Sequence, residues 1–156
     1  FAKVKKAELF IVGSGSDEEA LKKKAAALGN SVHFMSNLSD SDLKSAFADC
    51  DFFVLPSIEK SEAFGIVQLE AMVYGKPVIN TNLKTSVPLV SIDGETGITV
   101  KAGDSKELAD AMNTLINSDS LCKSLGENAK KRVVENFDIK TMIANVKTQC
   151  KDIVEE

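Results

Sequence analysis

Residues 52–80 read FFVLPSIEKSEAFGIVQLEAMVYGKPVIN, and this stretch decides the fold. The apolar run Phe52–Leu55 predicts a buried strand that a Pro-Ser pair ends. The almost wholly apolar segment Phe64–Tyr74 predicts a buried helix, which Gly75 closes. A Lys-Pro turn then leads into a second apolar strand at Val78–Asn80. A strand, a helix and a strand in this order form the unit from which parallel sheets are built.

The same alternation of strands and helices continues on both sides of this stretch. The expected strands are Glu8–Val12, Ser31–Met35 and Gly97–Val100, and the expected helices are Asp17–Leu28, Ser39–Cys50, Ser105–Asn117, Ser120–Val134 and Ile139 to the end, with Thr81–Val90 as a loop or short helix. Because the strands are apolar throughout rather than alternating, we expect helices on both faces of a parallel sheet. The prediction is one α/β domain over residues 1–156, with a Rossmann-like three-layer parallel sheet that binds ligands beyond the carboxyl ends of its strands.

The composition is that of a soluble globular protein of one-domain size. Of the 156 residues, 44% are hydrophobic and 27% are charged. The 19 basic and 23 acidic residues give a net charge of −4, and Arg132 is the single arginine. Nucleic acids are bound by clustered positive charge, and clamps on phosphate or guanine use several arginines. A nucleic-acid partner is therefore not expected.

His33 is the single histidine, and Cys50, Cys122 and Cys150 lie far apart in the sequence. This pattern offers no multi-histidine site and no short-spaced zinc pair, so no metal is expected. An odd number of scattered cysteines argues against a disulfide framework and suits the reducing cytoplasm. No apolar run reaches the length of a membrane span, and residues 1–6 do not resemble a signal peptide. Because the chain starts without methionine, we expect it to be a piece of a longer protein.

The first candidate for a ligand site is the turn Gly13–Gly15, which follows an apolar strand. A dinucleotide fingerprint needs a third glycine at position 18, which is Glu18. The acidic side chains of Asp17–Glu19 complement the helix dipole but repel a pyrophosphate. We interpret Gly13–Gly15 as a tight turn. The alternative is a turn that lines the edge of a ligand without holding phosphate.

The N-terminus of the helix predicted at Phe64–Tyr74 is a second candidate site. Gly65 lets a ligand approach the backbone. Free N–H groups of Gly65, Ile66 and Val67, together with the helix dipole, favour an anion. Glu70 lies on the face of Ile66 and Val67, about one turn (~5.4 Å) above them. A diphosphate at the N-terminus and a ribose diol beside Glu70 match a nucleotide in length. The alternative is that Glu70, as a buried carboxylate, pairs with a lysine or a backbone amide.

Glu62 is a third candidate, because it lies in the loop Ile58–Ala63 just ahead of this helix. An acid at this point complements the helix dipole and needs no ligand to explain it. The alternative is a functional carboxylate beside the anion site, which holds hydroxyl groups of whatever follows the phosphates. The residues alone leave both interpretations open.

Residues 61–79, SEAFGIVQLEAMVYGKPVI, resemble the signature of the retaining GT-B glycosyltransferases called group 1 or family 4. That signature has two glutamates with seven residues between them, followed by Ala-Met, a Gly-Lys-Pro turn and a strand. The segments 9–15, 32–34, 48–57 and 94–97 also occur in the family's order. The resemblance covers nearly the whole chain. It implies the C-terminal, donor-binding half of a GT-B fold, truncated at its N-terminus.

The resemblance implies a role for each matching residue at the predicted helix. Glu62 is implied as the catalytic residue, which holds hydroxyl groups of the donor sugar. Glu70 is implied to bind the ribose hydroxyls. The residues implied to approach the sugar and the diphosphate, mainly through their backbone groups, are Phe64, Gly65, Ile66 and Val67.

A second loop is implied to meet the nucleotide base. Leu38 would offer backbone groups to the base. Asp40 would accept a hydrogen bond from a guanine edge, which favours a GDP-sugar. The alternative for Asp40 is a plain helix start, because Ser39 and Asp42 resemble a capping box with Asp in the acid position.

The resemblance also implies the reaction of the whole enzyme. It is the transfer of a sugar from a UDP- or GDP-sugar to an acceptor hydroxyl, with retention at the anomeric carbon and without metal or cofactor. Members commonly build lipopolysaccharide, capsule or glycolipids at the cytoplasmic face of the membrane. A cytoplasmic enzyme, peripheral at the inner membrane face, is therefore implied. An N-terminal domain outside this chain would bind the sugar, polysaccharide or lipid-linked acceptor.

Two features of the family would precede Phe1, namely a strand and a loop whose Arg and Lys clasp the diphosphate. Transfer needs donor and acceptor aligned between two domains, and the leaving diphosphate needs cations. We therefore expect this fragment alone to bind nucleotide weakly and not to catalyse transfer. Without the preceding strand, we also expect one strand of the sheet to lack a neighbour unless another element covers it.

Other functions stay open at this point. Another GT-B enzyme acting on sugar nucleotides, such as an epimerase, would use similar nucleotide contacts, whereas a pyridoxal phosphorylase would need a cofactor lysine, and none stands out. A non-catalytic, flavodoxin-like α/β binding module would give Glu62 no role. The basic runs Lys22–Lys24 and Lys130–Arg132 are interpreted as solvated helix faces. Lys84 is interpreted in the same way, with phosphate contact as its alternative.

Overall fold

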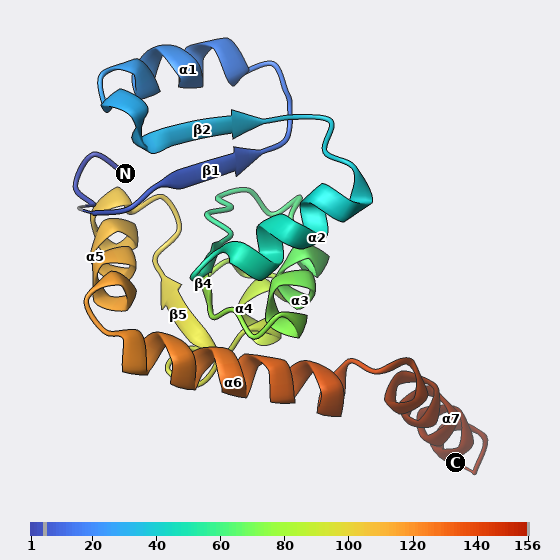
Figure 1. The fold of residues 1–156 in the computed structure, drawn as a ribbon. Coiled ribbons are helices and arrows are strands. Elements are labelled where there is room, and N and C mark those ends of the chain that lie inside the picture. Colours follow the sequence, from blue (N-terminus) through green and yellow to red (C-terminus); the bar gives the residue numbers. More distant parts are fainter. Residues whose placement is uncertain (5, 156) are drawn as a thin grey trace.

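The computed structural model describes residues 1–4 and 6–155, without the side chains of residues 30, 145 and 149–155. Strands and helices alternate as the sequence predicts (Figure 1). The strands are β1 (Leu9–Val12), β2 (Val32–Met35), β3 (Phe53–Val54), β4 (Val78–Thr81) and β5 (Gly97–Val100). The helices are α1 (Glu18–Ala26), α2 (Asp40–Asp49), α3 (Ile66–Val73), α4 (Val87–Val90), α5 (Ser105–Ile116), α6 (Asp119–Asn136) and α7 (Ile139–Glu155), with a 3₁₀ turn η1 (Gly29–Ser31) before β2.

The described strands form two sheets in which every pairing is parallel. β1 pairs with β2, where Leu9 lies beside Val32. In the second sheet β4 lies between β3 and β5, and Val78 has Phe53 on one side and Gly97 on the other. The predicted α/β fold with parallel strands is confirmed. Within the described residues, however, the ladder of hydrogen bonds is broken between β1 and β3.

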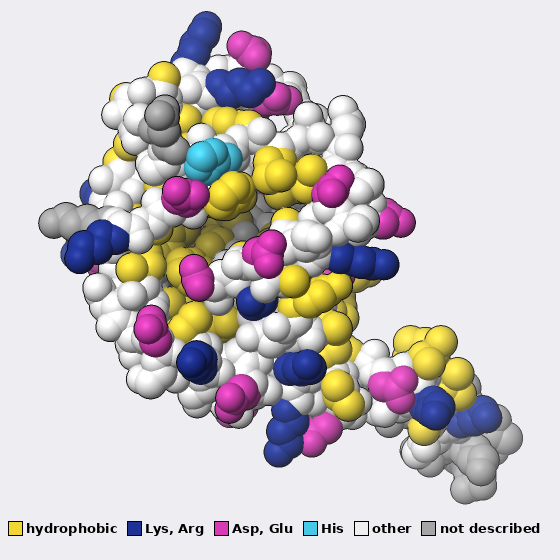
Figure 2. Space-filling model, in the orientation of Figure 1, with side chains coloured by type: hydrophobic (Ala, Val, Ile, Leu, Met, Phe, Trp, Pro, Cys, Tyr) yellow, Lys and Arg dark blue, Asp and Glu magenta, His cyan; other side chains and the backbone are white. Residues whose placement is uncertain are grey.

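This break leaves an unpaired edge on β1, as expected for a sheet in which one strand lacks a neighbour. Phe10 and Val12 of β1 are 53% and 44% exposed. Hydrophobic side chains also show between the β1–β2 pair and the elements below it (Figure 2). The smaller sheet is therefore separated from the larger one by a hydrophobic zone rather than by a continuous ladder.

The core lies on both faces of the β3–β4–β5 sheet. All four residues of β4 are buried. Val78 belongs to a cluster with Met72 of α3, and Ile79 belongs to a second cluster with Leu115 of α5. Because successive side chains of a strand point to opposite faces, α3 and α5 cover opposite faces of the sheet. The three layers that the apolar strands predict are present here, and α6 contributes to both clusters.

The C-terminal helix α7 extends away from the sheets beyond α6 (Figure 1). Its apolar side chains Ile139, Met142 and Ile143 are 65%, 55% and 44% exposed. Within the part of the chain that the structure describes, none of the helices has the length and hydrophobicity that a membrane crossing requires.

Candidate functional site

The candidate site lies in the loop between β3 and α3, at the carboxyl ends of the parallel strands. Thr81, at the end of β4, donates its hydroxyl hydrogen to the carbonyl of Ser57 at 2.7 Å. The amide of Ser86 donates to the carbonyl of Ala63 at 2.9 Å. These bonds fix the loop at the edge where ligands of parallel sheets bind.

A shallow hollow of about 370 Å³ opens at this loop and contains the predicted Glu62. It is lined by Ser57, Ile58, Glu59, Ser61 and Glu62. A second hollow, of about 330 Å³, is lined by Glu95, Asn128, Lys131, Arg132, Glu135 and Asn136. Because Glu95 precedes β5, the second hollow lies towards the amino-terminal edge of the sheet, opposite the expected ligand edge.

Glu62 is half-buried, and its Oε1 accepts a hydrogen bond from the amide of Gly65 at 3.0 Å. This bond is the one expected of an acid at a helix start. The other carboxylate oxygen, Oε2, has no hydrogen-bond partner among the described residues. One oxygen therefore holds the start of α3, and the other is open to a hydroxyl group. The two interpretations of Glu62 are compatible.

The N-terminus of α3 offers two of the three amides that the sequence analysis expected to be free. The amide of Gly65 donates to Glu62. The amides of Ile66 and Val67 donate to no acceptor in the described part of the chain. Glu62 lies three residues before Gly65, and its side chain reaches forward to the first amide. The remaining pair of N–H groups still meets the positive end of the helix dipole.

The surroundings of Gly65 within the protein require a glycine at this position, which the sequence alone did not indicate. It is buried and adopts a left-handed conformation, with φ 75° and ψ 56°. A Cβ at this position would lie 2.7 Å from both Nε2 of Gln68 and Cδ2 of Leu55. The need for glycine here is therefore explained within the protein, and the expected approach of a ligand to the backbone of Gly65 stays a prediction. The space of the missing side chain is filled by the protein itself.

Glu70 is exposed, so the prediction that α3 is buried all round is wrong. The buried residues of α3 are Gln68, Ala71 and Met72. Ile66, four residues before Glu70, is 66% exposed, and Val73 is 49% exposed. The helix covers one face of a sheet, and its outer face is free in the described chain. An exposed Glu70 needs no buried partner, so that alternative does not apply.

The side chains of Phe64 and Val67 pack against the first core cluster and are half-buried. The ring of Phe64 meets that of Phe137 edge to face, with 6.2 Å between centroids. Because these side chains are directed to the core, what Phe64 and Val67 offer to a ligand is their backbone. This packing suits the backbone contacts that the resemblance implies.

Leu38 and Asp40 lie on the separate loop that follows β2. Ser39 caps α2, because its Oγ accepts from the amide of Asp42 at 3.1 Å and donates to Asp42 Oδ2 at 2.7 Å. The predicted cap by Ser39 is confirmed, whereas the carboxylate of Asp42 accepts from the hydroxyl of Ser39 rather than from its backbone N–H, as a full capping box would require. Asp40 is exposed as the first residue of α2, and Leu38 is half-buried. In the described residues, no hydrogen bond or ion pair joins either of them to Glu62.

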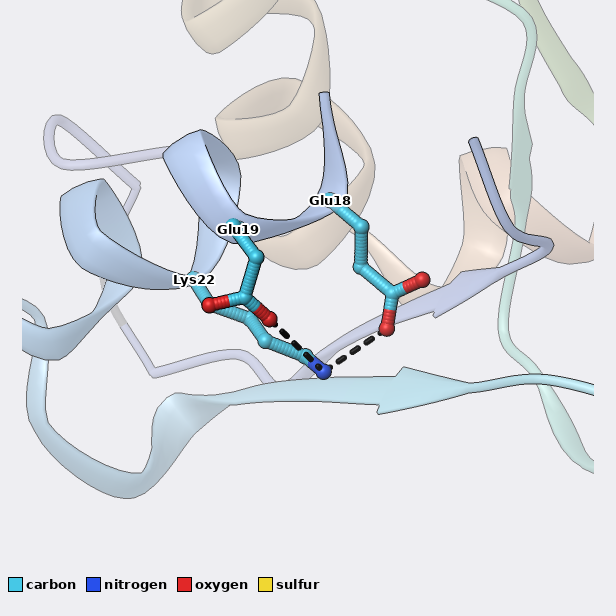
Figure 3. Close-up of polar contacts among 3 residues, drawn as sticks. All are labelled: Glu18, Glu19 and Lys22. Atoms are coloured by element: carbon cyan, nitrogen blue, oxygen red, sulfur yellow. Dashed lines mark ion pairs between the residues drawn. The ribbon is translucent and has the colours of Figure 1, made fainter. Parts of the chain in front are cut away.

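The turn after β1 is followed by the acidic start of α1. The carbonyl of Gly15 accepts from the amide of Glu18 at 3.2 Å. Figure 3 shows Lys22 beside two carboxylates, with its Nζ 2.7 Å from Glu18 Oε1 and 3.9 Å from Glu19 Oε1. The hydrogen bond with Glu18 and the charge of that carboxylate raise the pKa of Lys22. The acids are thus paired within their own helix, which supports a structural interpretation of this turn.

Most residues of the basic runs are solvated, as the sequence analysis expects. Lys22–Lys24, Lys84, Lys130 and Lys131 are exposed. Arg132 is the exception and corrects that interpretation. Its Nε donates to the carbonyl of Val90 at 2.9 Å, and a terminal nitrogen donates to that of Leu89 at 2.8 Å. The guanidinium therefore caps the end of α4.

The cysteines and the histidine have no part in the site. Cys50 and Cys122 are free, and burial raises the pKa of both thiols. The side chain of Cys150 lies outside the described residues. His33 stacks on Phe10, with 4.7 Å between ring centroids. Across the described residues, no group of three or more His, Cys, Asp or Glu side chains is arranged to hold a metal ion.

Two buried polar residues behind the site were missed from the sequence. Gln68 and Asn80 are 0% and 1% exposed, and Asn80 Nδ2 donates to Gln68 Oε1 at 2.9 Å. The available signal was spacing, because Gln68 shares the core-facing stripe of α3 with Ala71 and Met72, three and four residues on. A polar side chain on such a stripe needs a partner, and Asn80 in the fully buried strand β4 provides it.

Residues 1–132 match the family described as glycosyl transferases group 1. The chain belongs to this family of glycosyltransferases. The D-rhamnosyltransferase WbpZ of Pseudomonas aeruginosa is 36% identical over 128 residues, which are 81% of this chain and 34% of that protein. The O-antigen chain mannosyltransferase C of Escherichia coli is 34% identical over 134 residues, which are 85% of this chain and 36% of that protein.

A solved structure shows the same fold. The crystal structure of Anabaena Alr3699/HepE in complex with UDP-glucose matches 97% of this chain and 43% of its own, with a TM-score of 0.83 and 25% identity. The fold is that of the C-terminal domain of a GT-B glycosyltransferase, as the signature implies. The chain spans about a third of the length of the two bacterial relatives.

Proposed function

We propose that the chain is the donor-binding part of a retaining glycosyltransferase that uses a nucleoside diphosphate sugar. The observation that carries this proposal is the start of α3. There, two unpartnered amides, an open oxygen of Glu62 and the exposed Glu70 are all available to one ligand. The group comprises one binding point for an anion and two for hydroxyl groups. A nucleotide sugar carries one diphosphate and two rings with hydroxyl groups, the ribose and the sugar, which match these three points.

Each part of the donor has a matching group. The diphosphate lies at the amides of Ile66 and Val67, where the helix dipole favours negative charge. The ribose hydroxyls donate to Glu70, about one turn (~5.4 Å) along the exposed face from Ile66. The sugar hydroxyls donate to Oε2 of Glu62, which makes Glu62 the proposed catalytic residue. The scheme includes no metal or cofactor.

The base of the donor is either uracil or guanine. A similar protein has been solved with UDP-glucose, which favours a uridine nucleotide. Asp40 favours guanine, because its carboxylate can accept from the N–H groups of a guanine edge. Leu38, on the same loop, offers its backbone to either base.

The acceptor belongs to the whole protein rather than to this part of it. The relatives named above are a D-rhamnosyltransferase and an O-antigen chain mannosyltransferase. We therefore propose an acceptor hydroxyl on a cell-surface polysaccharide or glycolipid, bound by an N-terminal domain. Such an enzyme would work in the cytoplasm, peripheral to the inner face of the membrane.

Calorimetric titration of the full-length protein with UDP and with GDP tests the donor site. We expect one nucleotide to bind, and Glu70→Ala to weaken that binding roughly ten- to a hundredfold through loss of charge-assisted hydrogen bonds. Glu127→Ala on α6 is the control, because Glu127 is also an exposed helical glutamate but lies outside the site. Equal affinity of Glu70→Ala and the unaltered protein would rule out the ribose assignment. Binding of neither nucleotide would rule out a UDP- or GDP-sugar donor.

A further inference from the structure

We propose that Gln68 is a positioning residue for Glu62 and acts through the peptide group that joins Phe64 to Gly65. This inference rests on the proposed function, because it takes Glu62 as the ligand of the donor sugar. It adds a residue that does not touch the donor and yet determines where the carboxylate lies.

The peptide group between Phe64 and Gly65 is held from both sides. Its carbonyl, on Phe64, accepts from Nε2 of Gln68 at 3.2 Å. Its N–H, on Gly65, donates to Oε1 of Glu62 at 3.0 Å. The carbonyl and the N–H belong to one planar unit and point in opposite directions. A rotation of this unit therefore cannot break one bond without moving the other.

The side chain of Gln68 itself has a fixed orientation. Its Nε2 also donates to the carbonyl of Val87 at 3.2 Å, and its Oε1 accepts from Asn80 at 2.9 Å. The side chain is fully buried. A buried amide is costly unless its donors and acceptors are satisfied, so a flip of this group would forfeit several bonds together.

The side-chain amides of Gln68 and Asn80 are anchored to the larger sheet. Asn80 lies in β4, and its Oδ1 accepts from the hydroxyl of Thr99 in β5 at 2.7 Å. Its Nδ2 also donates to the carbonyl of Ser91 at 3.2 Å. A continuous series of hydrogen bonds therefore runs from β5 through β4 and Gln68 to the peptide group that Glu62 binds.

The peptide group needs such an anchor because it is followed by the flexible backbone of Gly65. Gly65 has φ 75°, and glycine passes between backbone conformations more easily than any other residue. Without the amide of Gln68, the peptide group can rotate and carry its N–H away from Glu62. In the described chain, the carboxylate of Glu62 has that N–H as its one hydrogen-bond partner. Loss of the anchor thus leaves the side chain of Glu62 without a fixed position.

The two parts of the donor respond differently under this proposal. The diphosphate and the ribose are bound by Ile66, Val67 and Glu70, whereas the sugar is bound by Glu62. Removal of the Gln68 amide therefore changes the affinity for the intact nucleotide sugar relative to that for its nucleoside diphosphate. The ratio of the two dissociation constants measures the contribution of the sugar, and it can be measured even in a variant without turnover.

The experiment uses the full-length protein and compares Glu62→Ala, Gln68→Met and the double variant. Methionine keeps the length of the side chain and removes the donor and the acceptor. The ligands are UDP-glucose and GDP-mannose, each beside its nucleoside diphosphate. We expect both single variants to change the dissociation-constant ratio by the same factor, and the double variant to change it no further, because Gln68 acts through Glu62. We also expect Gln68→Met to lower kcat for transfer roughly ten- to a hundredfold.

The control for stability alone is Leu115→Val, a core substitution on α5 away from the site. It is expected to lower the melting temperature without changing the ratio. Effects of Glu62→Ala and Gln68→Met that multiply in the double variant would overturn the positioning role and leave the proposed function intact. A ratio and a turnover that Glu62→Ala leaves unchanged would instead overturn the role of Glu62 in the proposed function.

Discussion

The carboxylate of Glu62 binds the protein through one of its two oxygens only. Oε1 stays on the amide of Gly65, while Oε2 faces no partner among the described residues. A sugar hydroxyl can therefore bind to Glu62 without displacing the bond that fixes the start of α3. Groups that are already in place before the ligand arrives cost less free energy to order on binding.

Gly65→Ala is predicted to destabilise the protein in the absence of any ligand. The left-handed backbone costs an L-residue about 1–2 kcal/mol. The new methyl group would also meet Gln68 and Leu55, and such overpacking costs about 1–3 kcal/mol more. Denaturant unfolding of the variant and of the unaltered protein measures this loss.

Gly103→Ala separates the two contributions to that loss. Gly103 has φ 80°, and a Cβ there would meet nothing within 4 Å. This variant carries the backbone cost alone, so we expect it to be clearly more stable than Gly65→Ala. Equal stability of the two variants would show that the space beside Gly65 is not filled as described.

The limits of sequence-based prediction are visible in these same residues. Glu62, Gly65 and Glu70 could be singled out, because their spacing along the chain is a local property. The pairing of Gln68 with Asn80 could not, because these two residues meet only when α3 packs on β4. An apolar composition likewise suggested a helix buried all round, although a helix on the outside of a sheet can bury only one face.

At the scale of elements, some helix ends are capped by residues nearby in the sequence and others by residues far away in it. The cap of α2 is formed by Ser39 and Asp42, three residues apart, and was predictable from the sequence. The cap of α4 is formed by Arg132, which is 42 residues from Val90. A contact of that separation depends on how α6 crosses the sheet. The sequence therefore predicted a solvated arginine where the structure has a half-buried one that donates hydrogen bonds to two backbone carbonyls.

The cap of α5 predicts a pH dependence of stability. Asp104 Oδ1 accepts from the amides of Glu107 and Lys106, and these hydrogen bonds lower the pKa of the carboxyl group. A pKa that is lower in the folded state gives stability that is present above the unfolded-state value and lost as pH falls through the folded-state pKa. Asp104→Asn keeps an accepting side chain but cannot titrate.

We therefore expect the free energy of unfolding to fall less steeply below about pH 4 in Asp104→Asn than in the unaltered protein. Urea unfolding at a series of pH values measures this slope. Asp110→Asn is the matched control, because it removes an exposed acid of the same helix that accepts no capping bond through its side chain. Identical slopes for the two variants would contradict the role of Asp104.

At the scale of the whole molecule, the larger sheet has both faces covered, whereas the β1–β2 pair does not. β4 is buried along its whole length, but α1 buries no residue fully. The parallel sheet could be predicted from apolar strands. The break between β1 and β3 could not be predicted from hydrophobicity, because it concerns which strand edges meet and not which residues are apolar.

The break in the ladder has a consequence for how the molecule opens. A pair of strands without further neighbours is marginally stable by itself, so the segment from β1 to β2 should unfold as a separate cooperative unit. We expect amide hydrogens of residues 9–12 and 32–35 to exchange at a lower opening free energy than those of residues 78–81 and 97–100. Native-state hydrogen exchange at increasing denaturant measures both. A single opening free energy for all four strands would mean that the two sheets open as one.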